Sequence, residues 1–321
     1  MVERPVGLLG PLLQNDRLRA WPASGDGGTP LLRQLERDGT FSDSTGPLAG
    51  PSGCYRGWPA MADLAAGLLE LAEQARAEGG AAQAAPPLSR RHGLRIERLE
   101  RRGGGWLLRD AAGELQAEAG WLVLSGTLLA HPRSLALLGC DEVPLKAANQ
   151  DLNDPQLAAL LEAVAGLRYD PRLALLLRLE DERANAWRAL PFRHLWFSDA
   201  ARSRWGLERI SLQLRPDGRC AVVAQARPQD LAACGLLTAA AALPEAAEAS
   251  EILALSKAVV DSLAPWISRR DLPALANRQR MRWGGAFPLE PGLDRDAMVC
   301  DTSQVAVCGD GIAGAGFGRL E

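Results

Sequence analysis

The residues with the clearest potential for ligand chemistry lie in the last stretch of the chain. Residues 305–308 are an apolar run, which predicts the end of a buried strand. Five glycines follow within residues 309–318, and Asp310 stands at the first bend. Glycine has no Cβ, so a backbone of this kind can approach a ligand closely. If a helix begins after the turn, its free N–H groups favour an electron-rich or anionic group.

The run Gly309-Asp-Gly-Ile-Ala-Gly314 also matches the pattern G-x-G-x-x-G. A complete dinucleotide-binding fingerprint requires a helix, a second strand and an acidic residue about 20 positions further on. Only three residues follow Gly318, so this run is not expected to begin the first βαβ unit of a nucleotide-binding fold. A Gly-rich turn that holds no ligand remains the alternative interpretation, and a stand-alone NAD-binding enzyme is the weakest one.

Two segments of this stretch, Cys308-Gly-Asp-Gly and Gly316-Phe-Gly-Arg-Leu-Glu321, resemble the closing motif of renalase-like, amine-oxidase-type flavoproteins. The resemblance implies FAD as the cofactor. It implies that Asp310, between Gly309 and Gly311, bonds the ribityl or pyrophosphate part of FAD. It further implies that backbone N–H groups at Gly316, Phe317 and Gly318 face the pyrimidine end of the isoalloxazine.

Two further stretches carry the same resemblance. Tyr55-Arg-Gly-Trp-Pro-Ala-Met61 precedes a helix whose apolar residues have helical spacing. In the family, this pattern marks the return of the chain from the substrate domain to the FAD domain. Trp283, followed by Gly284 and Pro288, approximates a family tryptophan beside the flavin, so the resemblance places Trp283 at the substrate and flavin face.

A β-meander is predicted for residues 94–119, with turns at residues 102–105 and 110–113. Residues 121–124 are all apolar, which favours a central strand covered on both faces. The family has the same order of helix, meander and apolar strand, which implies that the backbone near Ile96 contacts the adenine of FAD. The loop after the strand departs from the family pattern, because Ser125 and Gly126 replace its usual turn.

Together these elements predict the α/β class, with an incomplete FAD/NAD(P)-binding Rossmann-like domain and an inserted mixed α+β substrate domain. Residues 1–54 are rich in turn formers, and we expect an irregular first segment of the substrate domain. Residues 55–149 would form the middle of the FAD-binding domain, residues 150–276 the substrate domain, and residues 277–321 the last FAD-binding segment.

Within the predicted substrate domain, local signals define several elements. Asn153 or Asp154 is expected to cap a helix that begins at Pro155. Residues 216–218, Pro-Asp-Gly, predict a β-hairpin. The alternation of arginines in residues 277–283 fits a half-exposed strand.

Composition limits the remaining possibilities. Apolar residues make up 47% of the 321 residues, charged residues 23%, and the net charge is −3, which gives no reason to expect a nucleic-acid or membrane partner. The six cysteines form no C-x-x-C, and the three histidines lie far apart, which predicts free thiols and no metal site. No apolar run is long enough to cross a membrane. We expect a cytoplasmic protein with a small-molecule substrate, and its oligomeric state stays open.

The family opens with a strand, G-x-G-x-x-G and a helix, and no such pattern precedes residue 309. We therefore expect a chain that is truncated at both ends and binds FAD weakly or not at all. The resemblance implies hydride transfer from a reduced substrate, such as a dihydronicotinamide or an amine, to the flavin, with reoxidation by oxygen. No acid or base is assigned, because no catalytic constellation stands out. The absent fingerprint favours an alternative, a cofactor-free binding or scaffold relative.

Overall fold

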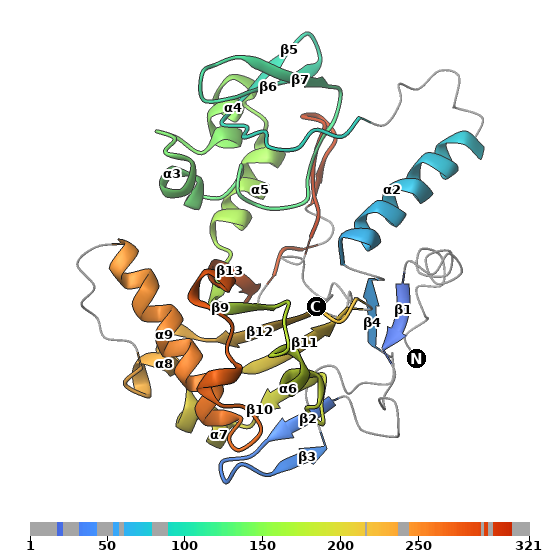
Figure 1. Ribbon diagram of the computed structural model, residues 1–321. Helices are drawn as coiled ribbons and strands as arrows, with labels where there is room; N and C mark the ends of the chain where they lie inside the picture. Colours follow the sequence, from blue (N-terminus) through green and yellow to red (C-terminus); the bar gives the residue numbers. More distant parts are fainter. Residues whose placement is uncertain are drawn as a thin grey trace. The chain divides into compact units, whose positions relative to one another are not determined.

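The computed structural model describes residues 18–21, 32–43, 54–57, 61–78, 89–215, 217–236, 244–289, 292–294 and 298–309. The chain divides into two compact units, and most of their helices and strands are labelled in Figure 1. The first unit consists of residues 1–87 and 171–284, and the second of residues 88–170 and 285–321. Each unit is thus assembled from segments that lie far apart in the sequence.

The first unit is built on a seven-stranded sheet with the order β13-β9-β12-β11-β10-β2-β3. Strands β9, β12, β11 and β10 pair antiparallel, as do β2 and β3, whereas β10 and β2 pair in parallel. The strands are β2 (Leu32–Leu35), β3 (Phe41–Asp43), β9 (Tyr169–Leu179), β10 (His194–Phe197), β11 (Arg209–Leu214), β12 (Cys220–Ala226) and β13 (Arg278–Pro288).

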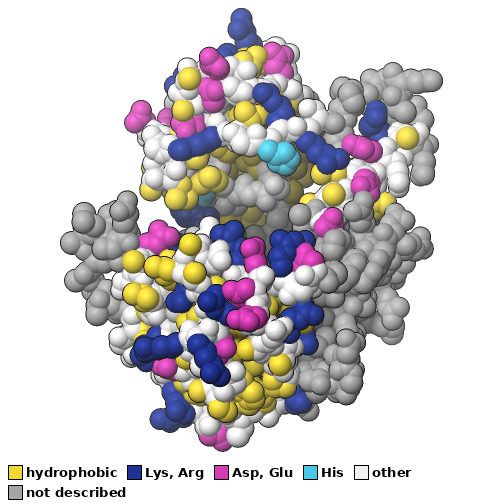
Figure 2. All heavy atoms as spheres, viewed as in Figure 1, with side chains coloured by type: hydrophobic (Ala, Val, Ile, Leu, Met, Phe, Trp, Pro, Cys, Tyr) yellow, Lys and Arg dark blue, Asp and Glu magenta, His cyan; other side chains and the backbone are white. Residues whose placement is uncertain are grey.

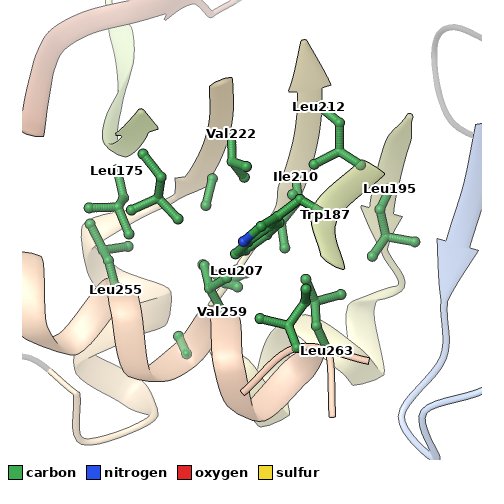
Figure 3. Close-up of a cluster of buried hydrophobic side chains, with 14 of the residues drawn as sticks. Leu175, Trp187, Leu195, Leu207, Ile210, Leu212, Val222, Leu255, Val259 and Leu263 are labelled. Carbon is green, nitrogen blue, oxygen red and sulfur yellow. The ribbon is translucent and has the colours of Figure 1, made fainter. Parts of the chain in front are cut away.

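Helices cover one face of this sheet (Figure 1). In β12, successive side chains alternate between buried and half-buried positions, because neighbouring residues of a strand point to opposite faces. The buried set packs against apolar residues of the helices, and Figure 3 shows the centre of this core. The helices are α6 (Ala184–Arg188), α7 (Asp199–Trp205), α8 (Pro228–Ala233) and α9 (Pro244–Ser262), and two short 3₁₀ turns follow, η3 (Arg269–Asp271) and η4 (Leu275–Asn277).

Trp187 lies in the middle of this core (Figure 3) and is fully buried. Its indole Nε1–H donates a hydrogen bond to the carbonyl oxygen of Asp271 at 2.9 Å. The ring therefore fills the space between sheet and helices without leaving its polar atom unsatisfied, which is the usual condition for burying tryptophan.

The first unit also contains a two-stranded antiparallel ribbon of β1 (Leu18–Trp21) and β4 (Cys54–Gly57), and helix α2 (Met61–Glu78). Strands β1, β2 and β3 correct the prediction that residues 1–54 are irregular. These segments are short and contain several polar residues, and β2 is a strand through its backbone pairing with β10, a partner about 160 positions away. Such long-range pairing overrides a weak local preference.

In its described residues, the second unit combines two small sheets and three helices. Strands β5 (Arg98–Arg102), β6 (Gly105–Arg109) and β7 (Leu115–Ala119) form the predicted antiparallel meander. The other sheet has the order β14-β15-β8, with β15 and β8 parallel. Its strands are β8 (Leu122–Leu124), β14 (Val299–Cys300) and β15 (Val305–Val307), and the helices are α3 (Arg133–Leu138), α4 (Pro144–Leu152) and α5 (Pro155–Ala165).

Helix α5 begins at the predicted position, but it packs elsewhere than expected. Asp154 is its N-cap and accepts hydrogen bonds from the N–H groups of Gln156 and Leu157, whereas Asn153 ends α4. The sequence grouped residues 150–170 with the substrate domain. In the structure, the apolar face of α5 joins the core of the second unit, together with Trp106 and Val305.

The prediction that residues 121–124 form a strand covered on both faces is wrong for the described residues. Val123 is 61% exposed, while its neighbours Leu122 and Leu124 are buried. The alternation shows that β8 buries one face only. An all-apolar sequence does not by itself distinguish a strand that is buried on both faces from one that is half covered.

The predicted α/β class is confirmed by the mixed sheets and helices of the described residues. Helices within the described ranges include none that is long and apolar enough to span a membrane. On the face shown in Figure 2, basic and acidic side chains are interspersed rather than gathered by sign. This distribution agrees with the small net charge of −3.

Truncation of Trp187 should destabilise the first unit strongly. We expect Trp187→Ala to lower the free energy of unfolding by about 3–5 kcal/mol, because it leaves a large cavity and an unpaired Asp271 carbonyl. Leu253→Ala is the matched control, since Leu253 lies on α9 with 58% of its surface exposed. Urea denaturation followed by circular dichroism measures both; equal losses in the two variants would contradict the assignment of Trp187 to the core.

Candidate functional site

The candidate site lies where the parallel strands β8 and β15 end. Val305 pairs with Leu122, and Val307 with Leu124. The pairing continues one residue further, because the N–H of Cys308 donates to the carbonyl oxygen of Leu124 at 2.8 Å. The carboxyl ends of both strands therefore lie at the same edge of the sheet. In open α/β folds, ligands bind at this edge.

Gly309 follows immediately and has a backbone that other residues rarely adopt. Its φ is +129°, and a Cβ at this position would stand 3.2 Å from the carbonyl oxygen of Ser125. The two strand ends thus approach so closely that only glycine fits without movement. The sequence predicted that the backbone after β15 approaches a ligand. The close approach found at Gly309 is to Ser125, and the ligand contact stays a prediction.

Buried polar contacts fix β15 from the side of its amino end. The carbonyl oxygen of Ser303 accepts a hydrogen bond from Trp106 Nε1 at 3.0 Å, and the Ser303 hydroxyl donates to the Asp154 carboxylate. Gln304 has a φ of +54°, and its carbonyl oxygen accepts from the N–H of Leu122 at 2.9 Å. These contacts join the meander, helix α5 and strand β8 to the turn that precedes β15.

Asp154 is ionised in this network. Burial raises the pKa of its carboxyl group, but hydrogen bonds from Ser303 and from the backbone N–H groups of Gln156 and Leu157 outweigh that effect. The net pKa therefore lies below its usual value, because the charged form accepts several hydrogen bonds.

The predicted cofactor residues can be followed only in part. Asp310, Gly311, Gly316, Phe317 and Gly318 lie outside the described residues. Ile96 is half-buried and packs against the core of the second unit, the same core that contains Val305 and Val307. The structure thus assigns Gly309 and Ile96 to one unit.

Trp283 belongs to the first unit. It lies on β13 with 47% of its surface exposed. The strand is held to α9 because the buried carboxylate of Glu251 accepts a hydrogen bond from Arg280 Nη1 at 2.8 Å and pairs with Arg282. The predicted half-exposed strand is confirmed, and its arginines anchor it beside Trp283.

A polar cluster that the sequence did not predict lies beyond the end of β8. The hydroxyls of Thr127 and Tyr169 lie 3.1 Å apart, and the guanidinium of Arg133 stacks over the Tyr169 ring at 4.3 Å from its centroid. Tyr169 stands 42 positions after Thr127. The only local hint was the unusual sequence after β8, which departs from the family pattern.

The hydrogen bonds of His131 in this cluster fix its tautomer. The backbone N–H of Arg133 donates to Nδ1 at 3.0 Å, so Nδ1 is the acceptor and Nε2 carries the proton toward the carbonyl oxygen of Leu167 at 3.3 Å. Burial lowers the pKa of His131, and the nearby Arg133 charge lowers it further, against the effect of the Leu167 contact. His131 is therefore neutral.

A second polar group lies on the first unit, on the sheet face opposite the helices. His194 is 1% exposed, and its Nδ1 lies 2.9 Å from the Ser211 hydroxyl. Burial lowers the pKa of His194 to about 3, with a further contribution from the charge of Arg209. Arg209 in turn hydrogen-bonds Gln225 at 2.8 Å and lies over the Trp196 ring. This face therefore presents a neutral imidazole beside a fixed cation.

In the described part of the chain, no group of three or more His, Cys, Asp or Glu residues could hold a metal ion. Five of the cysteines are free thiols: Cys140, Cys220, Cys234, Cys300 and Cys308. Burial raises the pKa of Cys300 and brings that of Cys220 to about 11, so these two thiols stay protonated near neutral pH.

Comparison with known proteins adds little beyond this geometry. No family model matches the chain, and no curated protein matches it. The solved structures that resemble it include Klebsiella pneumoniae HpxO complexed with FAD and uric acid, with 17% identity and a TM-score of 0.43. The match covers 88% of this chain and 57% of the HpxO chain. A flavoprotein/dehydrogenase from Cytophaga hutchinsonii shares 9% identity over 96% of this chain and 58% of that chain, with a TM-score of 0.42.

A triple mutant of putrescine oxidase is a further match, with 12% identity over 70% of this chain and 44% of that chain and a TM-score of 0.41. The chain spans about half the length of these structures. All three TM-scores lie below 0.5. These likenesses therefore carry no argument about this chain, and any function must be argued from its own residues.

The close approach at Gly309 makes a specific prediction. Gly309→Ala should lower the free energy of unfolding by about 1–3 kcal/mol, because it adds a Cβ against Ser125 in a backbone region that suits glycine. Two controls separate the causes. Gly104→Ala has a positive φ but open space and should cost about 1 kcal/mol, while Gly120→Ala, with open space and no positive φ, should change stability by less than about 0.5 kcal/mol. Urea denaturation of the three variants tests this order.

The buried neutral His194 predicts a pH dependence of stability. Its folded pKa of about 3 lies below the ordinary value of 6.5, so the unfolded chain takes up a proton first and stability falls as the pH drops below about 6.5. Between about pH 7 and pH 5 the expected loss is about 2 kcal/mol. Urea midpoints across this range should fall less steeply for His194→Gln than for the wild type. Parallel curves would show that His194 does not titrate in this way.

Proposed function

We propose that this chain belongs to an FAD-dependent oxidoreductase of the renalase-like, amine-oxidase-type class. The observation that carries the proposal is the close approach of Gly309 to Ser125 at the carboxyl ends of two parallel strands. At this edge glycine is required, because its φ is +129° and a Cβ would stand against the Ser125 carbonyl oxygen; Asp310 and Gly311 follow directly in the sequence. The resemblance in sequence supplies the identity of the cofactor.

The residue types at these positions suit such a group. Gly309 would allow the backbone to lie against the cofactor, and the Asp310 carboxylate would accept hydrogen bonds from ribityl or ribose hydroxyls. Backbone N–H groups of Gly316, Phe317 and Gly318 would face the electron-rich pyrimidine end of the ring. The backbone near Ile96 would contact the adenine.

Bound FAD would supply a two-electron acceptor for a hydride from a reduced substrate carbon, with oxygen as the oxidant that restores it. The chain's own part is to bind and orient the substrate and to limit access of water. Trp283, held by the arginines of β13, offers a broad apolar ring for a planar substrate. A dihydronicotinamide or an amine is the substrate class that the resemblance supports.

We further propose that the protein acts in the cytoplasm on a small molecule. Support comes from the free thiols of its described cysteines, which suit a reducing compartment. Basic and acidic side chains are interspersed on the surface in Figure 2, and the net charge is small, so neither feature favours a polyanionic partner.

The proposal is tested by titrating the purified chain with FAD and recording the visible flavin spectrum. We expect a weak but saturable change in wild type. Gly309→Ala should weaken FAD binding at least tenfold, or by about 1.4 kcal/mol, because the new Cβ occupies the approach to Ser125. Gly104→Ala, in an open hairpin turn, should bind FAD like the wild type.

A folded wild-type chain that leaves the flavin spectrum unchanged would overturn the proposal that this chain itself holds FAD. That result would instead support the cofactor-free binding or scaffold alternative. Where binding is observed, anaerobic addition of a reduced nicotinamide or an amine identifies the substrate, because the true electron donor bleaches the bound flavin band much faster than that of free FAD.

A further inference from the structure

The proposed flavin function leaves one group of polar side chains without a role. It consists of Thr127, Arg133 and Tyr169, together with the neighbouring His131, and all four belong to the second unit. Thr127 stands three residues after Leu124, the last residue of β8. The group therefore begins at the carboxyl edge that also carries Gly309.

The first observation concerns an uncompensated positive charge. Arg133 is half-buried over the Tyr169 ring, and its Nε is enclosed with no hydrogen-bond partner. Among the residues that the structure describes, no carboxylate forms an ion pair with this guanidinium. Stacking on an aromatic ring is favourable for arginine, but it satisfies none of the guanidinium's five N–H donors.

The second observation concerns a spare hydroxyl hydrogen. The Thr127 and Tyr169 hydroxyls form one hydrogen bond at 3.1 Å, in which either can be the donor. One hydroxyl hydrogen of the pair is used in this contact. The other hydroxyl hydrogen is available to donate to another acceptor. Within the described ranges these hydroxyls contact no further protein acceptor.

The neighbouring imidazole does not supply the missing acceptor. His131 Nδ1 already accepts from the backbone N–H of Arg133, and Nε2 faces the carbonyl oxygen of Leu167. Its lowered pKa keeps the ring neutral, so it adds no negative charge to balance Arg133. The cluster thus offers N–H and O–H donors around one aromatic ring without an anion among them.

We propose that Arg133, Tyr169 and Thr127 form a subsite for the phosphate group of a small molecule. A phosphate presents acceptor oxygens in several directions, so it can take hydrogen bonds from the guanidinium and from the spare hydroxyl together. Tyr169 orients both partners, because its ring supports Arg133 and its hydroxyl holds Thr127. The bound anion balances the charge that the protein leaves unpaired.

Two sources could supply this phosphate at the edge of the sheet. One is the diphosphate of the cofactor, in which case the inference rests on the proposed flavin function. The other is a separate phosphorylated ligand, in which case it does not. The subsite chemistry is the same in both, so the experiment must report phosphate binding and flavin binding separately.

Inorganic pyrophosphate is the probe, and phosphorus NMR of the titrated chain gives its affinity. We expect Arg133→Met to weaken pyrophosphate binding at least tenfold, since the charge and the donors are lost while an unbranched apolar side chain is kept. Tyr169→Phe should weaken it several-fold and leave the fold intact. Arg98→Met is the control, because Arg98 is an exposed arginine of β5 in the same unit.

Competition then identifies the source. Displacement of pyrophosphate by FAD but not by riboflavin assigns the subsite to the cofactor's diphosphate, and no displacement by either assigns it to a separate phosphorylated ligand. The proposal is overturned if the folded wild type does not bind pyrophosphate at millimolar concentrations, or if Arg133→Met and Arg98→Met bind it as the wild type does. The flavin spectrum, recorded in parallel, shows whether the proposed function fails independently of this subsite.

Discussion

The parallel pairing of β15 with β8 is the constraint on which the candidate site depends. It joins Val305 to Leu122, which lie more than 180 positions apart in the sequence. The two strands contribute only three paired residues each, so backbone hydrogen bonds alone hold them weakly. Their position is secured by the buried contacts of Ser303 with Trp106 and Asp154. The same ionised Asp154 caps α5, so the helix and the strand share one anchor.

The structural arginines differ from the candidate ligand arginine, because each structural arginine pairs with a carboxylate. Arg172 is buried and forms two hydrogen bonds to Glu208, at 2.6 and 3.0 Å. Arg280 and Arg282 share the buried carboxylate of Glu251. In each case the carboxylate offsets the cost of removing charge from water. Arg133 lacks such a partner among the described residues and has only the Tyr169 ring. Its charge is therefore left for an anionic ligand to balance.

The division of the hydrophobic core explains why the unit boundaries differ from those expected. The sequence placed changes at residues 54, 149 and 276, whereas the compact units change near residues 87, 170 and 284. Helix α5 accounts for one difference, because Leu157, Leu160 and Val164 are buried with Trp106 in the second unit. Whether the two units correspond to a substrate domain and a cofactor domain remains a prediction.

Local elements were largely readable from the sequence, because their causes are local. The meander follows from its Gly-containing turns, the start of α5 from Asp154 and Pro155, and the hairpin of β11 and β12 from residues 216–218. Gly309 after β15 indicated a bend in the chain, and its φ of +129° is one that favours glycine. These signals depend on the backbone freedom and capping chemistry of a few adjacent residues.

The tertiary structure decided everything that joins distant residues. It made strands of residues 32–35 through pairing with β10, exposed Val123 on a fully apolar strand, and brought Tyr169 to Thr127 and Arg133. The sequence alone could not show these outcomes, because burial and hydrogen-bond partners depend on which segments meet in space. Residue types determine which donors, acceptors and charges each position has. Packing determines which of these groups find partners within the chain.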